Sequence, residues 1–227
     1  MCPIFELGFE LRLKQKSYTE DKMFSTKVMN SSGRLIDPFN LEDEDFDINV
    51  VALTLSRICR FWGQTTEFYS VAQHCLALES IFDNHNIELK RWAMAHEIFE
   101  GLTGMDVPSP IKHSPHMADY VAAEEKCLQQ AAKIYGLSTP FPQEIKIADK
   151  RMMVTEALRF MSSENYDWKQ IAEPFKISVI KAPLSSEKAQ EAFLEKWLEL
   201  FGDKTSRLKA PRSLIDELSV KVERILY

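Results

Sequence analysis

The stretch His96–Glu100 places one imidazole and two carboxylates within five consecutive residues. If the stretch is helical, each residue advances about 100° around the axis, so His96, Glu97 and Glu100 face one sector. Imidazole and carboxylate groups bind borderline divalent metals and transfer protons beside them. The alternative is a surface turn in which His96 and Glu100 form an i,i+4 pair.

Other residues along the chain could join this cluster. His74 lies within an otherwise apolar stretch, Asp149 lies between apolar and basic residues, and Asp106 begins a proline-containing segment. Taken singly, His74 fits a core or surface histidine and Asp149 fits a surface ion pair. His113 and His116 form a competing i,i+3 metal pair directly after that proline-containing segment. These residues form one site only if the fold brings them together.

The elements that must position these residues are helices. Hydrophobic periodicity predicts helices near 49–62, 70–84, 88–104, 116–135, 143–162, 186–201 and 214–226. Pro108 and Pro110 predict a rigid extended loop, because proline disfavours helix at the residue before it. Residues 177–180 fit either a short strand or a buried turn. The predicted fold class is therefore all-α.

The chain is expected to form one domain with three parts. These are an irregular N-terminal segment packed on the core (1–48), a catalytic helical core (49–163) and a C-terminal helical extension of the same domain (164–227). Asp47 and Ser70 are predicted N-caps, because their side-chain oxygens can accept from exposed first-turn amides. Gly136 and Gly202 are predicted to end helices.

Composition limits the classes of protein that fit. A chain of 227 residues with 45% hydrophobic residues can bury a substantial core, and its net charge is −6. We expect no nucleic-acid polymer and no membrane as partner, because such binders are usually basic. No stretch approaches the roughly 18 apolar residues of a membrane span, and no secretory signal is visible. The four cysteines form no C-x-x-C pair. We therefore expect reduced thiols in a cytoplasmic protein.

Five motifs occur in order along the chain. They are Arg60-Phe61, Tyr69-Ser70-Val71-Ala72-Gln73-His74, Ala95-His96-Glu97-x-x-Glu100, Asp106-x-Pro108-x-Pro110-x-Lys112 and Ala148-Asp149. Together they resemble the HD-domain nucleotide phosphohydrolases, and within them the 5′-deoxynucleotidases and phage-type deoxyadenosine-triphosphate hydrolases. The resemblance covers roughly residues 30–160 and implies an HD-domain helical bundle core.

The resemblance implies a divalent metal held by His74, His96, Glu97 and Asp149. Two imidazoles and two carboxylates suit Mn²⁺, Co²⁺, Fe²⁺, Zn²⁺ or Ni²⁺, with Mg²⁺ as a further option. It also implies acid–base roles for Glu100 and Asp106. The chain departs from the family at Glu97, where an Asp is usual, and in the spacing before Asp106, which is one residue longer.

The resemblance further implies substrate contacts by Arg60, Phe61, Lys112 and Lys146. The planar guanidinium of an arginine can bind phosphate through two parallel hydrogen bonds. Phe61 suits stacking on a base or sugar, with ordinary core packing as the alternative. Each lysine is either a phosphate contact or a solvated surface charge.

These features predict a metal-dependent deoxynucleotide phosphohydrolase, with a 5′-deoxynucleotidase that releases phosphate from dNMPs favoured. A dNTP triphosphohydrolase is the first alternative, because Arg60, Lys112 and Lys146 could neutralise a triphosphate. A non-catalytic HD-like module that binds nucleotide or a protein partner is the second, motivated by Glu97 and the acidic composition. The resemblance also implies a homo-oligomer.

Overall fold

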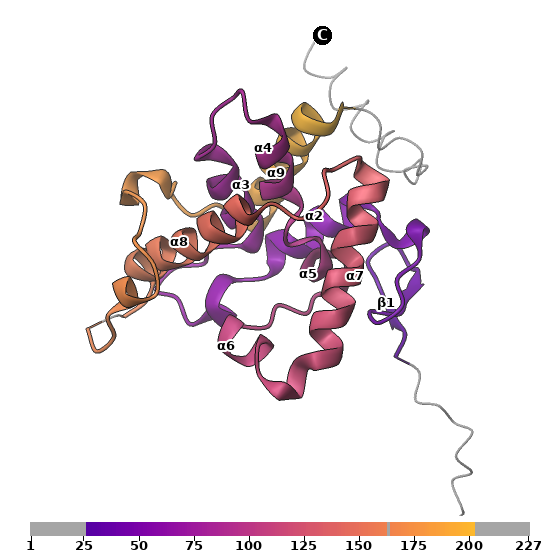
Figure 1. The fold of residues 1–227 in the computed structure, drawn as a ribbon, viewed down its shortest axis with the longest axis horizontal. Coiled ribbons are helices and arrows are strands. Elements are labelled where there is room, and N and C mark those ends of the chain that lie inside the picture. Colours follow the sequence, from indigo (N-terminus) through magenta and orange to yellow (C-terminus); the bar gives the residue numbers. More distant parts are fainter. Residues whose placement is uncertain (1–25, 163, 203–227) are drawn as a thin grey trace, which may run out of the picture.

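Helices account for most of the fold, as the sequence predicts (Figure 1). The computed structural model describes residues 26–162 and 164–202. Its helices are α2 (Ile48–Arg57), α3 (Val71–Ser80), α4 (Ile87–Ala95), α5 (Ile98–Thr103), α6 (Ser109–Lys112), α7 (Ala118–Tyr135), α8 (Gln143–Phe160) and α9 (Ser186–Phe201). Short 3-10 turns include η2 (Arg60–Gly63), η4 (Trp168–Gln170) and η5 (Ile177–Val179). Within the described residues, no helix is both long and apolar enough to cross a membrane.

The helix ends follow the predicted capping residues. The Asp47 side chain accepts from the Asn49 amide at the start of α2, and the Ser70 side chain accepts from the Gln73 amide at the start of α3. Gly136 ends α7 with a left-handed φ of 67°, which glycine adopts without a Cβ clash. These signals are local, and so they could be read from sequence.

The N-terminal part of the described chain packs on α7. Strands β1 (Val28–Met29) and β2 (Leu35–Ile36) form a short antiparallel hairpin, with Val28 opposite Ile36. Figure 1 shows this hairpin beside α7. The Tyr135 hydroxyl donates to the Phe46 carbonyl at 2.9 Å, and Phe46 is buried in the main core. The segment predicted to be irregular therefore contains a hairpin and is anchored to the helices.

The helical core is built around α2, which packs against α3, α5 and α9. The contact with α5 is close at Gly101. A Cβ placed there would lie 2.6 Å from Val51 Cγ1, well inside contact distance. Only glycine fits this position without movement of α2 or α5. The approach matters for the site because Gly101 follows Glu100 directly.

Helix α9 belongs to the same core as α2, α3 and α4. Phe193, Trp197 and Phe201 are buried on one of its faces, and the rings of Trp197 and Phe201 stack at 4.1 Å between centroids. The bounds of α9 match the helix expected at 186–201. Residues 177–180 form the η5 turn rather than a strand. The helix expected at 214–226 lies outside the described residues.

Two expectations about the segment 88–112 are wrong. The single helix expected over 88–104 is interrupted, because α4 ends at Ala95 and α5 begins at Ile98. No proline or glycine lies between Ile87 and Glu100. The break coincides with His96 and Glu97, whose side chains enter the candidate site. The loop expected to be extended contains α6. Pro110 has no amide hydrogen, and it is tolerated there because the first-turn amides of a helix have no partner within the helix.

Candidate metal centre

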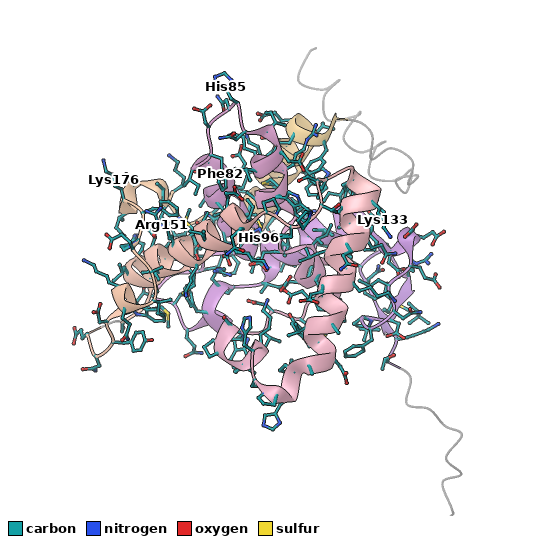
Figure 2. All side chains as sticks on the ribbon, viewed as in Figure 1. Phe82, His85, His96, Lys133, Arg151 and Lys176 are labelled. Atoms are coloured by element: carbon teal, nitrogen blue, oxygen red, sulfur yellow. The ribbon has the colours of Figure 1, made fainter. Side chains whose placement is uncertain are left out.

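Four side chains from three parts of the chain meet in the middle of the molecule. One donor atom from each lies within 4.8 Å of the others, and the residues are His74, His96, Glu97 and Asp149. They come from α3, the end of α4, the start of α5, and α8. Figure 2 shows His96 at this central position. The structure thus brings together the four residues that the resemblance implied as ligands. Within residues 26–162 and 164–202, no other such group occurs, and His113 and His116 belong to none.

The two histidines face each other through their Nε2 atoms. His74 Nδ1 lies 2.7 Å from a carboxylate oxygen of Glu156, and His96 Nδ1 lies 2.8 Å from the Ala93 carbonyl. Because carboxylate and carbonyl oxygens only accept, each Nδ1 carries a hydrogen and, in a neutral ring, Nε2 carries a lone pair. The two Nε2 atoms are 3.2 Å apart. Two facing lone pairs need a proton or a cation between them.

The spacing of the donor atoms fits one metal ion. Two nitrogens bound at about 2.0–2.1 Å, with an angle near 90–109°, lie roughly 3 Å apart, close to the observed Nε2–Nε2 separation of 3.2 Å. Asp149 Oδ1 lies 3.1 Å from His74 Nε2. Glu97 Oε1 lies 3.6 Å from His96 Nε2 and 3.8 Å from His74 Nε2. The longer glutamate side chain therefore reaches the cluster from the break between α4 and α5.

The site carries an excess of negative charge. Arg60 is the cation that contacts it directly, with Nε 3.0 Å from Glu156 Oε2 and a terminal nitrogen 3.5 Å from Glu97 Oε1. The carboxylates of Glu97, Asp149 and Glu156 face this single guanidinium and two histidines. With neutral histidines, two negative charges remain uncompensated. The Glu156 side chain is fully buried and that of Glu97 is 13% exposed, whereas that of Asp149 is 39% exposed. Uncompensated charge is costly in the buried part of the site. A divalent cation would neutralise these two charges.

The pKa values respond to this imbalance. Burial and Arg60 act to lower the pKa of His74, but the carboxylates of Glu156 and Asp149 outweigh them and raise it to about 9. Burial lowers the pKa of His96. Burial acts to raise the pKa of the Asp149 carboxyl, yet its hydrogen bond with His74 holds it below the usual range. In the metal-free protein, protonated His74 therefore supplies one of the two missing positive charges.

Glu100 is buried beside the cluster and is only 1% exposed. Its Oε1 lies 3.4 Å from the Tyr120 hydroxyl and 3.8 Å from the Lys112 ammonium. Its Oε2 has no hydrogen-bond partner among the described residues. Burial, reinforced by the charge of Glu97, raises the pKa of the Glu100 carboxyl well above its ordinary value. Glu100 is thus suited to keep its proton to a higher pH than an ordinary glutamate.

Asp106 lies at the edge of the site, where burial and then the charge of Glu97 raise the pKa of its carboxyl. The Trp62 indole donates to the Asp106 carbonyl at 2.8 Å, which joins η2 to the loop before α6. Phe61 and Trp62 have φ angles of 54° and 55°. This left-handed conformation costs a non-glycine residue about 1–2 kcal/mol. The two strained residues follow Arg60 directly.

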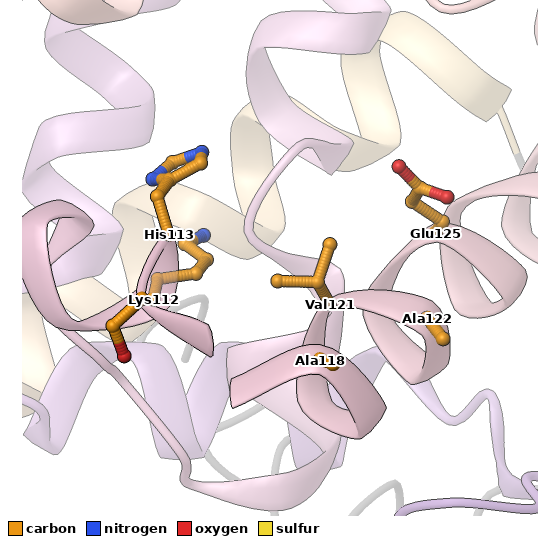
Figure 3. Close-up of a pocket in the computed structure, with 7 residues that line it drawn as sticks. Lys112, His113, Ala118, Val121, Ala122 and Glu125 are labelled. Carbon is orange, nitrogen blue, oxygen red and sulfur yellow. The ribbon is translucent and has the colours of Figure 1, made fainter. Parts of the chain in front are cut away.

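The predicted basic residues take different places. Lys112 Nζ lies 2.6 Å from Glu124 Oε1, and Glu100 and Glu124 raise the pKa of the ammonium against the effect of burial. Lys112 also lines a surface pocket of about 430 Å³ between α6 and α7 (Figure 3). Lys146 is exposed, with its ammonium 5.7 Å from the centre of the Phe141 ring. Among the described residues, it forms no ion pair with the cluster.

Phe61 has the neighbours expected of an aromatic residue at a site entrance. Its ring lies 5.5 Å from the Arg60 guanidinium carbon. The Trp168 ring of η4 packs edge-on against it, with 6.2 Å between centroids. The ring of Phe61 is half-buried between these two side chains.

Sequence reasoning missed Glu156, Tyr120 and Trp62. A signal for Glu156 was present, because it lies seven residues after Asp149 and two helical turns return it to the same face. Tyr120 is held by the Met105 carbonyl, which accepts from its hydroxyl at 2.6 Å. That contact joins α7 to a loop and has no local sequence signal. The contact of Trp62 with Asp106 is equally non-local.

The comparisons with known proteins give relatives without assigned activity. No model of a known protein family matches the chain. Over 116 residues the chain is 34% identical to the uncharacterized protein YfdR of Escherichia coli. The matched region makes up 51% of this chain and 62% of YfdR. Over 125 residues it is 32% identical to the uncharacterized protein RCAP_rcc00048 of Rhodobacter capsulatus. The matched region makes up 52% of this chain and 63% of that protein. The chain therefore spans less than two thirds of the length of these relatives.

Proposed function

We propose that this chain is a divalent-metal-dependent phosphohydrolase acting on deoxynucleotides. The observation that carries the proposal is the cluster in which two buried histidines hold their Nε2 atoms 3.2 Å apart among excess carboxylate charge. The motifs that resemble HD-domain phosphohydrolases supply the expected substrate class. A transition metal would be held by His74, His96, Glu97 and Asp149, and would supply Lewis acidity toward a phosphate oxygen and a water molecule.

The chain's own residues then divide the remaining work. Arg60 binds a phosphate oxygen through its terminal N–H groups, since its Nε is already occupied by Glu156. Glu100 holds a proton, because its pKa is raised, and donates it to the leaving oxygen. Asp106 lies closer to solvent and orients the attacking water or accepts its proton.

The positions of the basic residues favour a monophosphate substrate. A triphosphate tail needs several cations beside the metal, whereas Lys146 is exposed and forms no ion pair with the cluster among the described residues. Lys112 is already paired with Glu124 at 2.6 Å. Arg60 is left as the main partner for a phosphate group. We therefore favour a 5′-deoxynucleotidase over a dNTP triphosphohydrolase.

The test is a panel of dNMPs, NMPs and dNTPs incubated with the metal-free protein and added Mn²⁺ or Co²⁺. We expect free phosphate from dNMPs, lost in the Asp149→Ala variant and retained in an Asp119→Ala control on α7. Release of triphosphate or pyrophosphate from dNTPs would support the triphosphohydrolase instead. A protein that binds neither metal and hydrolyses none of these compounds would be a non-catalytic module, contrary to the proposal.

A further inference from the structure

Glu156 is a buried carboxylate with a partner on each oxygen. It is 0% exposed, its Oε1 lies 2.7 Å from His74 Nδ1, and its Oε2 lies 3.0 Å from Arg60 Nε. A carboxylate with no access to water is costly unless both oxygens are satisfied. The side chain is therefore held in one orientation by two groups that belong to the candidate site.

The contact with His74 bears on the metal site. His74 is itself fully buried, and a hydrogen bond to Nδ1 fixes both its ring orientation and the nitrogen that carries the lone pair. Glu156 thereby directs His74 Nε2 toward Asp149 and His96. Asp149 and Glu156 lie two turns apart on α8, so a single helix places one carboxylate at each nitrogen of the ring.

The contact with Arg60 affects how the site would bind a phosphate anion. Glu156 occupies Nε, which leaves the terminal N–H groups for a ligand and for the 3.5 Å contact with Glu97. Helix α8 is a firm support for this arrangement, since Met152, Val154 and Ala157 on either side of Glu156 are buried. The same carboxylate therefore fixes a metal ligand and the candidate phosphate-binding arginine.

We infer that Glu156 is a positioning residue that sets both metal affinity and anion affinity of the cluster. This inference rests on the proposed function, because it takes His74 as a metal ligand and Arg60 as the phosphate contact. Glu156 is not one of the four candidate ligands, so it acts through these two side chains. Glu97 also lies near both side chains, 3.5 Å from Arg60 and 3.8 Å from His74 Nε2, but among the described residues Glu156 is the carboxylate that contacts His74 Nδ1 and Arg60 Nε.

The matched control is Glu79, another buried carboxylate held by an ion pair. Glu79 lies on α3, as His74 does, and its Oε1 is 2.7 Å from Lys90 Nζ. Glu79→Gln makes the same chemical change as Glu156→Gln in a buried pair outside the metal cluster. Both variants lose an ion pair, so a purely structural role predicts similar losses of thermal stability and unchanged metal binding for both.

The experiment is titration of the metal-free full chain with Mn²⁺ and Co²⁺, followed by inorganic phosphate added to the metal-loaded protein. We expect Glu156→Gln to weaken metal binding about 10- to 100-fold, as loss of ligand-orienting partners typically does. Phosphate affinity should also fall, and Glu79→Gln should match the wild type in both. Glu156→Asp should recover part of the metal affinity because it keeps the charge.

The outcomes separate this inference from the proposed function. A wild-type protein that binds no metal overturns both. A wild-type protein that binds metal, with Glu156→Gln binding it equally well, overturns the inference alone. In the Arg60→Gln background, Glu156→Gln should no longer change phosphate affinity. A full additional loss there would show that Glu156 does not act on the anion through Arg60.

Discussion

The molecule buries charge in two regions that differ in balance. In the first, Glu79 faces Lys90 at 2.7 Å and Lys196 at 3.9 Å, and Lys196 also pairs with Glu199. Two carboxylates therefore meet two ammonium groups. In the second, Glu97, Asp149 and Glu156 face one guanidinium and two histidines. Positive and negative charges match in the first region, whereas carboxylates are in excess in the second. This difference supports the proposed cation site in the second region and a structural role for the first.

The largest effect is expected from removing a ligand of the unbalanced region. His96→Ala should abolish binding of Mn²⁺ or Co²⁺ and phosphate release with it, because the Nε2 atom that faces His74 is lost. Metal content after dialysis, measured by elemental analysis, checks this. His116→Ala removes an exposed histidine and should keep wild-type metal content. Equal metal content in the two variants would place the metal elsewhere.

A smaller loss is expected from Glu100→Gln. Removing a general acid typically slows a reaction about 10²- to 10⁴-fold, while the ligand set stays intact. We expect kcat for dNMP hydrolysis to fall by this amount with unchanged metal content. Glu125→Gln on the exposed face of α7 is the control. If Glu100→Gln keeps full kcat, Glu100 is not the proton donor.

A substitution in the balanced region should lower the stability of the protein and leave its metal affinity unchanged. Lys90→Ala leaves Glu79 buried without its close partner, and breaking such a pair costs about 3 kcal/mol. Chemical denaturation should show this loss of unfolding free energy, while metal affinity stays at the wild-type value. Replacing both residues by apolar ones should restore most of the stability. A drop in metal affinity in either variant would contradict the separation of the two regions.

A pH dependence should appear only in the unbalanced region. The pKa of His74 is raised to about 9 in the metal-free protein, so a metal must displace a proton there. Apparent metal affinity should then rise about tenfold per pH unit, worth about 1.4 kcal/mol, up to pH 9. For the metal-free fold the sign is opposite. Protonated His74 stabilises it fully below about pH 6.5, and this stability is lost as the pH rises through 9.

Titration with Co²⁺ at pH 6.5, 7.5 and 8.5 checks the predicted rise in metal affinity. Denaturation of the metal-free protein at the same pH values checks the predicted loss of stability. Glu79→Gln should keep the wild-type slope of metal affinity. An affinity that does not change with pH would mean that no proton leaves His74 on binding.

Local signals in the sequence predicted much of this structure. Helix existence followed from apolar periodicity, and Asp47, Ser70 and Gly136 marked ends correctly because capping depends on nearby amides. The break at His96–Glu97 has no proline or glycine behind it and depends on side chains far away in sequence. Pattern reading could not find it.

Part of the candidate site could be predicted, because its residues belong to motifs that occur in a recognisable order along the chain. The four implied ligands do lie together. Glu156 was missed although its spacing from Asp149 was readable, because its partners His74 and Arg60 are 82 and 96 residues away. Lys146, which the sequence left as either a phosphate contact or a solvated surface charge, is exposed beside Phe141. A helix face is known only once its packing partners are known.

The left-handed residues Phe61 and Trp62 have a consequence for engineering. Their backbone is held out of its preferred conformation by anchors on both sides, Arg60 on Glu156 and Trp62 on the Asp106 carbonyl. Phe61→Gly would relieve this strain, since glycine adopts such φ values freely, but it would also remove the ring contacts with Arg60 and Trp168. The turn could then sample other shapes, and Arg60 would be placed less exactly. The strained backbone is therefore expected to be part of what fixes the position of Arg60.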